Sequence, residues 1–80
     1  DNTENTKDTE ESKRFKESIR AIVNDLPRDQ KEVVIMRMYY DMSFKEIAAA
    51  TDCSINTALG RMRYGLINLR KLMTYKQAPV

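Results

Sequence analysis

The residues best suited to chemistry lie close together in the carboxyl-terminal half of the chain. Asn56 and Thr57 have short hydrogen-bonding side chains, and Arg61 follows one turn later at helical spacing. These are side-chain types that hydrogen-bond to base edges and to phosphates. Gly60 has no side chain, so a backbone could approach a ligand closely there, and Tyr64 can stack or hydrogen-bond farther along the same face. The chemistry predicted is non-covalent recognition of a polyanion.

The sequence contains few residues suited to catalysis or to metal binding. The 80 residues include no His and one Cys, Cys53, so we find no cluster with metal-ligand spacing and no activated nucleophile. We therefore expect neither an enzyme nor a cofactor. The longest aliphatic run, residues 33–36, is far shorter than the roughly 20 residues of a membrane span. No membrane association is expected.

Charge is distributed unevenly along the chain. The formal net charge is +2, yet residues 1–12 hold five acidic residues and one Lys, whereas residues 53–80 hold five basic residues and no acidic one. This asymmetry is expected when one face of a protein meets a polyanion. The alternative is a solvated helix face with no ligand.

The composition also divides the chain into parts. Residues 1–12 contain no apolar side chain, so they cannot offset the entropy cost of ordering and are expected to be a disordered acidic tail or linker. A single domain is placed at residues 13–75 and a short tail at residues 76–80. The chain opens on Asp1 rather than on Met, which favours a fragment of a longer protein.

Apolar periodicity predicts an all-α fold with four helices. The first helix spans residues 14–26, and Pro27 both ends it and suits the start of the second helix, which ends near Asp41. The second helix has its period on Gln30, Val33, Val34, Met36 or Arg37, and Tyr40. The other residues expected in the core are Phe15, Ile19, Ile22, Val23, Leu26, Phe44, Ile47, Ala48, Ile55, Ala58, Met62, Leu66, Leu69 and Met73.

The last two helices form the informative unit. Ser43 and Glu46 form a capping box for a short helix that ends near residue 50, and Ser54 caps a long helix over residues 55–74. The three-residue turn between them contains Asp52, which tolerates a left-handed conformation. The outward side of the long helix is expected to hold Thr57, Gly60, Arg61, Tyr64, Asn68 and Lys71.

Two capped helices joined by a tight turn are typical of a helix-turn-helix, whose second helix enters the major groove of DNA. The fold expected is a small winged-helix-like or related domain. The candidate DNA-binding residues are Ser43, Phe44, Lys45, Ser54, Asn56, Thr57, Gly60, Arg61, Arg63 and Tyr64. The alternatives stay open: the serines act as caps alone, the arginines are solvated, and Gly60 is merely tolerated.

A second signal comes from motifs over residues 26–73. The matching residues are Leu26, Pro27, Gln30, Glu32, Val33, Arg37, Ser43, Glu46, Ile47, Ala48, Ser54, Thr57, Ala58, Arg61, Met62, Leu69 and Arg70. In this order and spacing they resemble, without a gap, region 4 of bacterial RNA polymerase sigma factors of the extracytoplasmic-function type.

The resemblance implies a function and partners. Such domains bind the double-stranded promoter −35 element within the RNA polymerase holoenzyme, and they dock on the flap of the polymerase β subunit. It further implies a cytoplasmic protein, a monomeric isolated domain, and an anti-sigma factor as a possible partner. The candidate polymerase-contacting residues are Ile35, Met38 and Tyr39.

Leu59 and Gly60 depart from the family pattern, which often has a basic and polar pair there. We therefore expect the remaining polar residues of this helix to carry more of the base recognition than usual, with Arg61→Ala costing about 1–3 kcal/mol of binding if Arg61 reads a base. Two rivals remain. One is the helix-turn-helix output domain of a response regulator; the other is a helical protein-interaction module that binds no nucleic acid.

Overall fold

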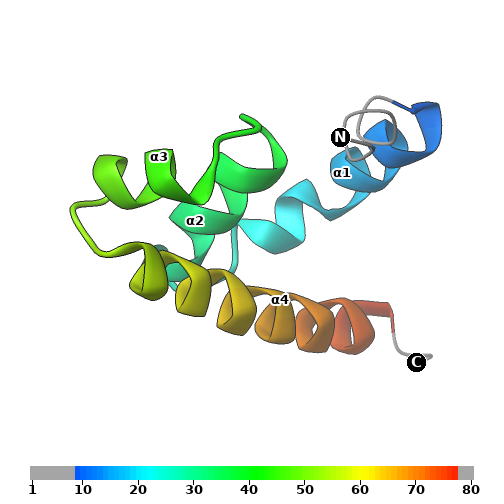
Figure 1. Ribbon diagram of the computed structural model, residues 1–80. Helices are drawn as coiled ribbons and strands as arrows, with labels where there is room; N and C mark the ends of the chain where they lie inside the picture. The colour runs from blue at the N-terminus through cyan, green and yellow to red at the C-terminus, as the bar shows by residue number, and fades with distance from the viewer. Residues whose placement is uncertain (1–8, 78–80) are drawn as a thin grey trace.

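The computed structural model describes residues 9–77, and these form four helices: α1 (Glu10–Val23), α2 (Arg28–Met38), α3 (Phe44–Ala50) and α4 (Ile55–Gln77). The predicted all-α class is confirmed, and because residues 9–77 contain no strand, this part of the chain has no wing. Figure 1 shows α4 along one side, with α3 above its amino-terminal half, α1 toward its carboxyl-terminal half and α2 between them. No helix among the described residues has the length and apolar character to cross a membrane.

The first helix begins and ends earlier than predicted, since it spans Glu10–Val23 rather than residues 14–26. Thr9 is its N-cap and accepts a hydrogen bond from the Ser12 amide at 3.0 Å, and Glu10 and Glu11 occupy the first turn. An N-cap side chain and acidic residues near the positive end of the helix dipole stabilise this end without any apolar contact. Residues 10–12 are therefore helical, contrary to the tail expected there. Residues 1–8 lie outside the described residues.

The second helix ends earlier than predicted, at Met38. Asp41 adopts a left-handed conformation with φ 56°, which reverses the chain before α3. The Arg37 side chain donates to the carbonyl of Met42 at 2.9 Å, and the Met42 amide donates to the carbonyl of Met36 at 3.1 Å. These bonds hold the loop that delivers the chain to α3.

Both predicted features of the α3 ends are confirmed. Ser43 and Glu46 form a reciprocal capping box. At the other end Asp52 has φ 56°, the Cys53 amide donates to the Ala48 carbonyl at 3.0 Å, and the Asp52 amide donates toward Ala49 at 3.4 Å. This is a Schellman ending, which closes a helix through one left-handed residue. The turn therefore fixes the direction in which α4 leaves α3.

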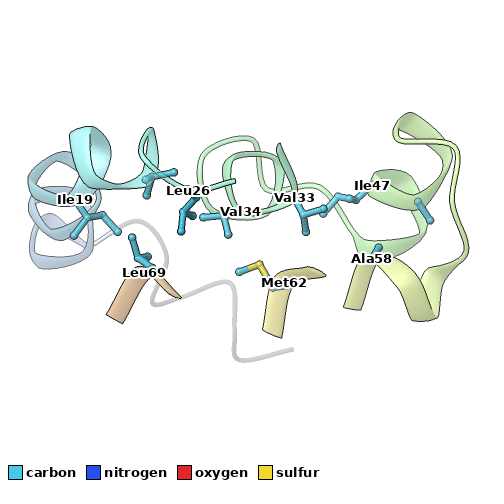
Figure 2. Packing of buried hydrophobic residues seen from close by; sticks show 10 residues of the cluster. Ile19, Leu26, Val33, Val34, Ile47, Ala58, Met62 and Leu69 are labelled. Carbon is cyan, nitrogen blue, oxygen red and sulfur yellow. The ribbon is translucent and has the colours of Figure 1, made fainter. Parts of the chain in front are cut away.

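The core is a row of buried side chains between α4 and the other three helices (Figure 2). In Figure 2, Ala58, Met62 and Leu69 of α4 face the side chains of the other helices along this row. Its ten members are Ile19, Val23, Leu26, Val33, Val34, Ile47, Ala58, Met62, Leu69 and Ala48. Every one of them belongs to the predicted core.

Four predicted core residues are wrong, because their side chains are exposed: Phe15 (47%), Tyr40 (67%), Ile55 (46%) and Leu66 (41%). Tyr40 lies beyond the end of α2, so the helical period no longer applies to it. The other errors on α4 share one cause. At about 100° per residue, its buried face is turned away from Ile55 and Leu66 and toward Gly65.

Gly65 is buried where α4 crosses α2. A Cβ atom built there would lie 2.9 Å from Val34 Cγ2 and 3.4 Å from the Gln30 Cβ. On the same side of α4, Asn68 donates its side-chain amide to Gln30 Oε1 at 2.7 Å. Asn68 is therefore half-buried against α2 rather than outward as predicted. The helix continues to Gln77, so the predicted tail residues 76 and 77 are helical, and residues 78–80 lie outside the described residues.

Candidate nucleic-acid interface

Residues 44–64 form the helix-turn-helix: α3, the turn at 51–54, and the first turns of α4. Ser54 closes the amino end of α4, since its hydroxyl oxygen accepts from the Thr57 amide at 3.0 Å and its hydroxyl donates to Thr57 Oγ1 at 3.0 Å. The predicted cap is confirmed. Thr57 is thereby engaged in the cap, although its side chain stays exposed.

The exposed face of α4 is rotated about the helix axis relative to the predicted one. Asn56, Arg63 and Tyr64 are exposed, and a Cβ atom at Gly60 would meet nothing within 4 Å. Ala58 and Met62 point into the core from the same two turns. Since residues three or four apart are neighbours on a helix, Asn56, Gly60 and Arg63 form a continuous outward strip. A backbone or base edge can reach this strip without displacing any side chain of the core.

Arg61 is placed differently from Arg63. Its side chain is 31% exposed, and its Nη2 atom lies 3.9 Å from Asp29 Oδ2 in the first turn of α2. An exposed pair at this distance is weak, worth about 0–1 kcal/mol. Even so, it orients Arg61 along the flank of α4 that faces α2. Sequence reasoning ranked Arg61 above Arg63 as a base reader, and it gave no sign of Asp29.

The positive charge of the interface is concentrated on α4. α4 contains no acidic residue, and Arg63 and Arg70 are exposed on it. Lys45 is exposed in the first turn of α3. Asp52, in the turn between the helices, is an exposed acidic residue on this part of the surface. The helix-turn-helix therefore carries three basic residues, Lys45, Arg61 and Arg63, against two acidic ones, Glu46 in the capping box and Asp52 at the turn.

The two candidate residues that precede Lys45, Ser43 and Phe44, have structural roles. The Ser43 hydroxyl accepts from the Glu46 amide at 3.1 Å within the capping box. Phe44 is half-buried, with the Arg37 guanidinium 4.7 Å above its ring centroid. This cation–π contact ties the start of α3 to the end of α2. Ser43 remains exposed.

The three candidate polymerase-contacting residues are half-buried and do not lie in one place. Ile35 and Tyr39 line a hollow of about 490 Å³ between α1 and α2, together with Glu17 and Arg20. Met38 lines a separate groove of about 250 Å³, whose other walls are Phe15, Leu66, Leu69, Arg70 and Met73.

Tyr39 is also part of the α1–α2 contact. Its hydroxyl donates to the Lys16 carbonyl, and the Arg20 guanidinium lies 5.0 Å from its ring centroid. Burial raises the pKa of the Tyr39 phenol, and the positive charge of Arg20 partly offsets that rise. Tyr39 therefore joins two helices as well as lining the hollow.

Sequence reasoning missed one feature of the interface. Leu59 and Ile55 are 42% and 46% exposed on the first two turns of α4, beside Asn56. The family pattern predicts a polar contact at the position of Leu59, and the apolar period wrongly places Ile55 in the core. The spacing of Ala58 and Met62 alone, with Ile55 left out, would have indicated the correct face.

Comparison with known families gives one match. A family model described as "Sigma-70, region 4" matches residues 16–62, which is more than half of the chain and includes the helix-turn-helix as far as Met62. No curated protein and no solved structure matches the chain significantly.

Proposed function

Because the chain belongs to the sigma-70 region 4 family, we propose that it binds the promoter −35 element as the region 4 domain of an extracytoplasmic-function sigma factor and so directs transcription initiation. This family consists of DNA-binding transcription domains rather than enzymes. The observation that supports the proposal best is the open strip of Asn56, Gly60 and Arg63 on a helix without acidic residues. A positive, unobstructed second helix is what major-groove recognition needs.

The placement of the two arginines suggests different roles. Arg63 lies on the outward strip one turn after Leu59 and is free to donate two hydrogen bonds to a guanine edge. Arg61 lies on the flank beside Asp29, where the sugar-phosphate backbone passes a helix seated in the groove. We assign base recognition to Arg63 and Asn56, and phosphate contact to Arg61.

The remaining candidate residues surround these two. Tyr64 is exposed one turn beyond Gly60 and reaches the backbone or a base farther along the groove. Ser54 and Thr57 bring the amino end of α4 to a phosphate, where a helix dipole favours negative charge. Lys45 and Ser43 lie at the start of α3, the helix that crosses the DNA backbone, with Phe44 behind them.

Binding by this domain alone is expected to be weak. A single helix-turn-helix covers one half-site, and phosphate contacts dominate its affinity. Tethering to RNA polymerase core raises the effective concentration of the domain at the promoter. For the β-flap contact we retain Ile35 and Tyr39, whose hollow lies between α1 and α2 and leaves the recognition helix free. Met38 lies in the other groove.

Within this proposal the isolated domain is a monomer, and the cytoplasm is its compartment, since bacterial transcription takes place there. An anti-sigma factor would act by covering either the hollow or the DNA-binding strip. Of the two rival functions, the family match disfavours the response-regulator output domain. The other rival, a protein-interaction module that binds no DNA, is distinguished from the proposed function by the binding experiment below.

The test is fluorescence anisotropy of a labelled duplex, selected from a randomised pool with polymerase core present. We expect Arg63→Ala to cost about 1–3 kcal/mol and to relax base preference at one position, whereas Arg61→Ala weakens binding to all sequences alike and lowers the salt slope by about 1. Both variants should keep the far-ultraviolet circular dichroism of the parent. Absence of salt-sensitive binding to any duplex would instead favour the interaction module.

A further inference from the structure

We propose that Leu59, flanked by Ile55, recognises the C5-methyl group of a thymine in the major groove. The inference rests on the proposed function, since it requires α4 to lie in a DNA duplex. Leu59 and Ile55 are 42% and 46% exposed on the first two turns of α4. The thymine methyl is the apolar group that base edges present in the major groove, and apolar side chains are its partners there.

The position of Leu59 within the strip supports this assignment. Leu59 follows Ile55 by four residues and Asn56 by three, and it precedes Arg63 by four. On a helix these spacings make all three its direct neighbours. Leu59 is therefore enclosed by the residues proposed to enter the groove, and it reaches the same base edges as Asn56 and Arg63.

Packing does not account for the two apolar side chains. The core side of the same turns is filled by Ala58 at 0% and Met62 at 9% exposure. Neither Ile55 nor Leu59 belongs to the buried cluster or to the partly buried residues packed against it. Their contact surface is therefore available to a ligand.

Charge identifies the class of that ligand. α4 contains no acidic residue, and Arg63 follows Leu59 by four residues on the same face of the helix. An apolar edge beside the Arg63 guanidinium group is complementary to a surface that alternates anionic and apolar groups, as phosphates and thymine methyls do along the major groove. A protein partner is the other possible occupant, and the test below separates the two.

The inference has a consequence for specificity. Leu59 can accept or donate no hydrogen bond, so a cytosine or adenine amino group facing it loses water without gaining a partner. Thymine instead covers the leucine with its methyl group. Burying one methyl-sized apolar group between them corresponds to about a fourfold gain in affinity.

The experiment compares thymine with uracil, which differs by this methyl group alone. The probe is the duplex most enriched by the 80-residue chain from a randomised pool, resynthesised with uracil in place of each thymine in turn. We expect one replacement to weaken binding of the parent chain about fourfold. Leu59→Ala should bind the thymine and uracil duplexes equally.

Leu66→Ala is the matched control, because Leu66 lies on the same helix, is 41% exposed and is two turns beyond Leu59. It should retain the thymine preference, as should Arg63→Ala, which lowers the affinity for both duplexes. Equal affinity of the parent for thymine and uracil duplexes, or a preference that survives in Leu59→Ala, would overturn the inference while leaving the proposed function intact. No binding of the parent to any duplex would overturn both.

Discussion

The two glycines of α4 offer one chemical change in two surroundings. A Cβ atom at Gly60 would meet nothing within 4 Å, whereas at Gly65 it would lie 2.9 Å from Val34 Cγ2. Val34 is fully buried, and a β-branched side chain has little freedom to rotate away. Replacing each glycine by alanine therefore isolates the packing at the α2–α4 crossing from the intrinsic preference of alanine for helices.

The magnitudes follow from these contacts. Alanine favours a helix interior over glycine by about 1 kcal/mol, so Gly60→Ala should raise the free energy of unfolding by about that amount. At Gly65 the same gain is opposed by overpacking, which costs about 1–3 kcal/mol. Gly65→Ala should therefore be less stable than Gly60→Ala by about 1–3 kcal/mol.

Urea unfolding followed by far-ultraviolet circular dichroism measures both variants against the parent. Equal stabilisation by the two substitutions would refute the close crossing at Gly65, and with it the rotation of α4 that places Arg63 outward. Gly60→Ala has a second readout. If the DNA backbone approaches α4 at Gly60, this variant binds duplex more weakly than the parent although its fold is more stable.

Two further predictions concern single side chains. Burial raises the pKa of Tyr39 above 10.0, so its neutral phenol stabilises the fold below pH 10, and this contribution is lost as pH rises through the raised pKa. The loss of unfolding free energy at alkaline pH should therefore be shallower in Tyr39→Phe than in the parent. Tyr40→Phe, whose side chain is 67% exposed in the parent, is the control and should follow the parent. Asp52→Asn keeps a residue type that tolerates φ 56° and removes the acidic charge of the turn. It should therefore tighten duplex binding at low salt and leave the urea midpoint unchanged. Weaker binding would show that Asp52 does not face the DNA.

Local signals in the sequence predict the fold class, the start of α2, both ends of α3 and the start of α4. The capping box at Ser43, the cap at Ser54 and the left-handed Asp52 each depend on residues within three or four positions of one another. Such contacts can be predicted without knowing the tertiary structure. The early start of α1 also depends on a local signal, the cap at Thr9, which apolar periodicity does not include.

The errors fall where a contact joins distant parts of the chain. Ile55 and Leu66 were assigned to the core because they are apolar, yet both are exposed. Periodicity fixes the spacing of an apolar face but leaves its direction uncertain when a helix also has apolar residues beside that face. The candidate interface inherited the same uncertainty, which is why Arg61 was preferred to Arg63.

The direction of α4 is set by the first turn of α2. Asp29 pairs with Arg61, and Gln30 accepts a hydrogen bond from Asn68 38 residues later in the chain. Gly65 lies between these two contacts and lets the helices approach. The close approach at Gly65, the Asn68–Gln30 bond and the buried side chains of Ala58, Met62 and Leu69 fix the rotation of α4 about its own axis, and that rotation decides which arginine faces outward. Residues of α2 thereby determine which side chains of α4 face outward.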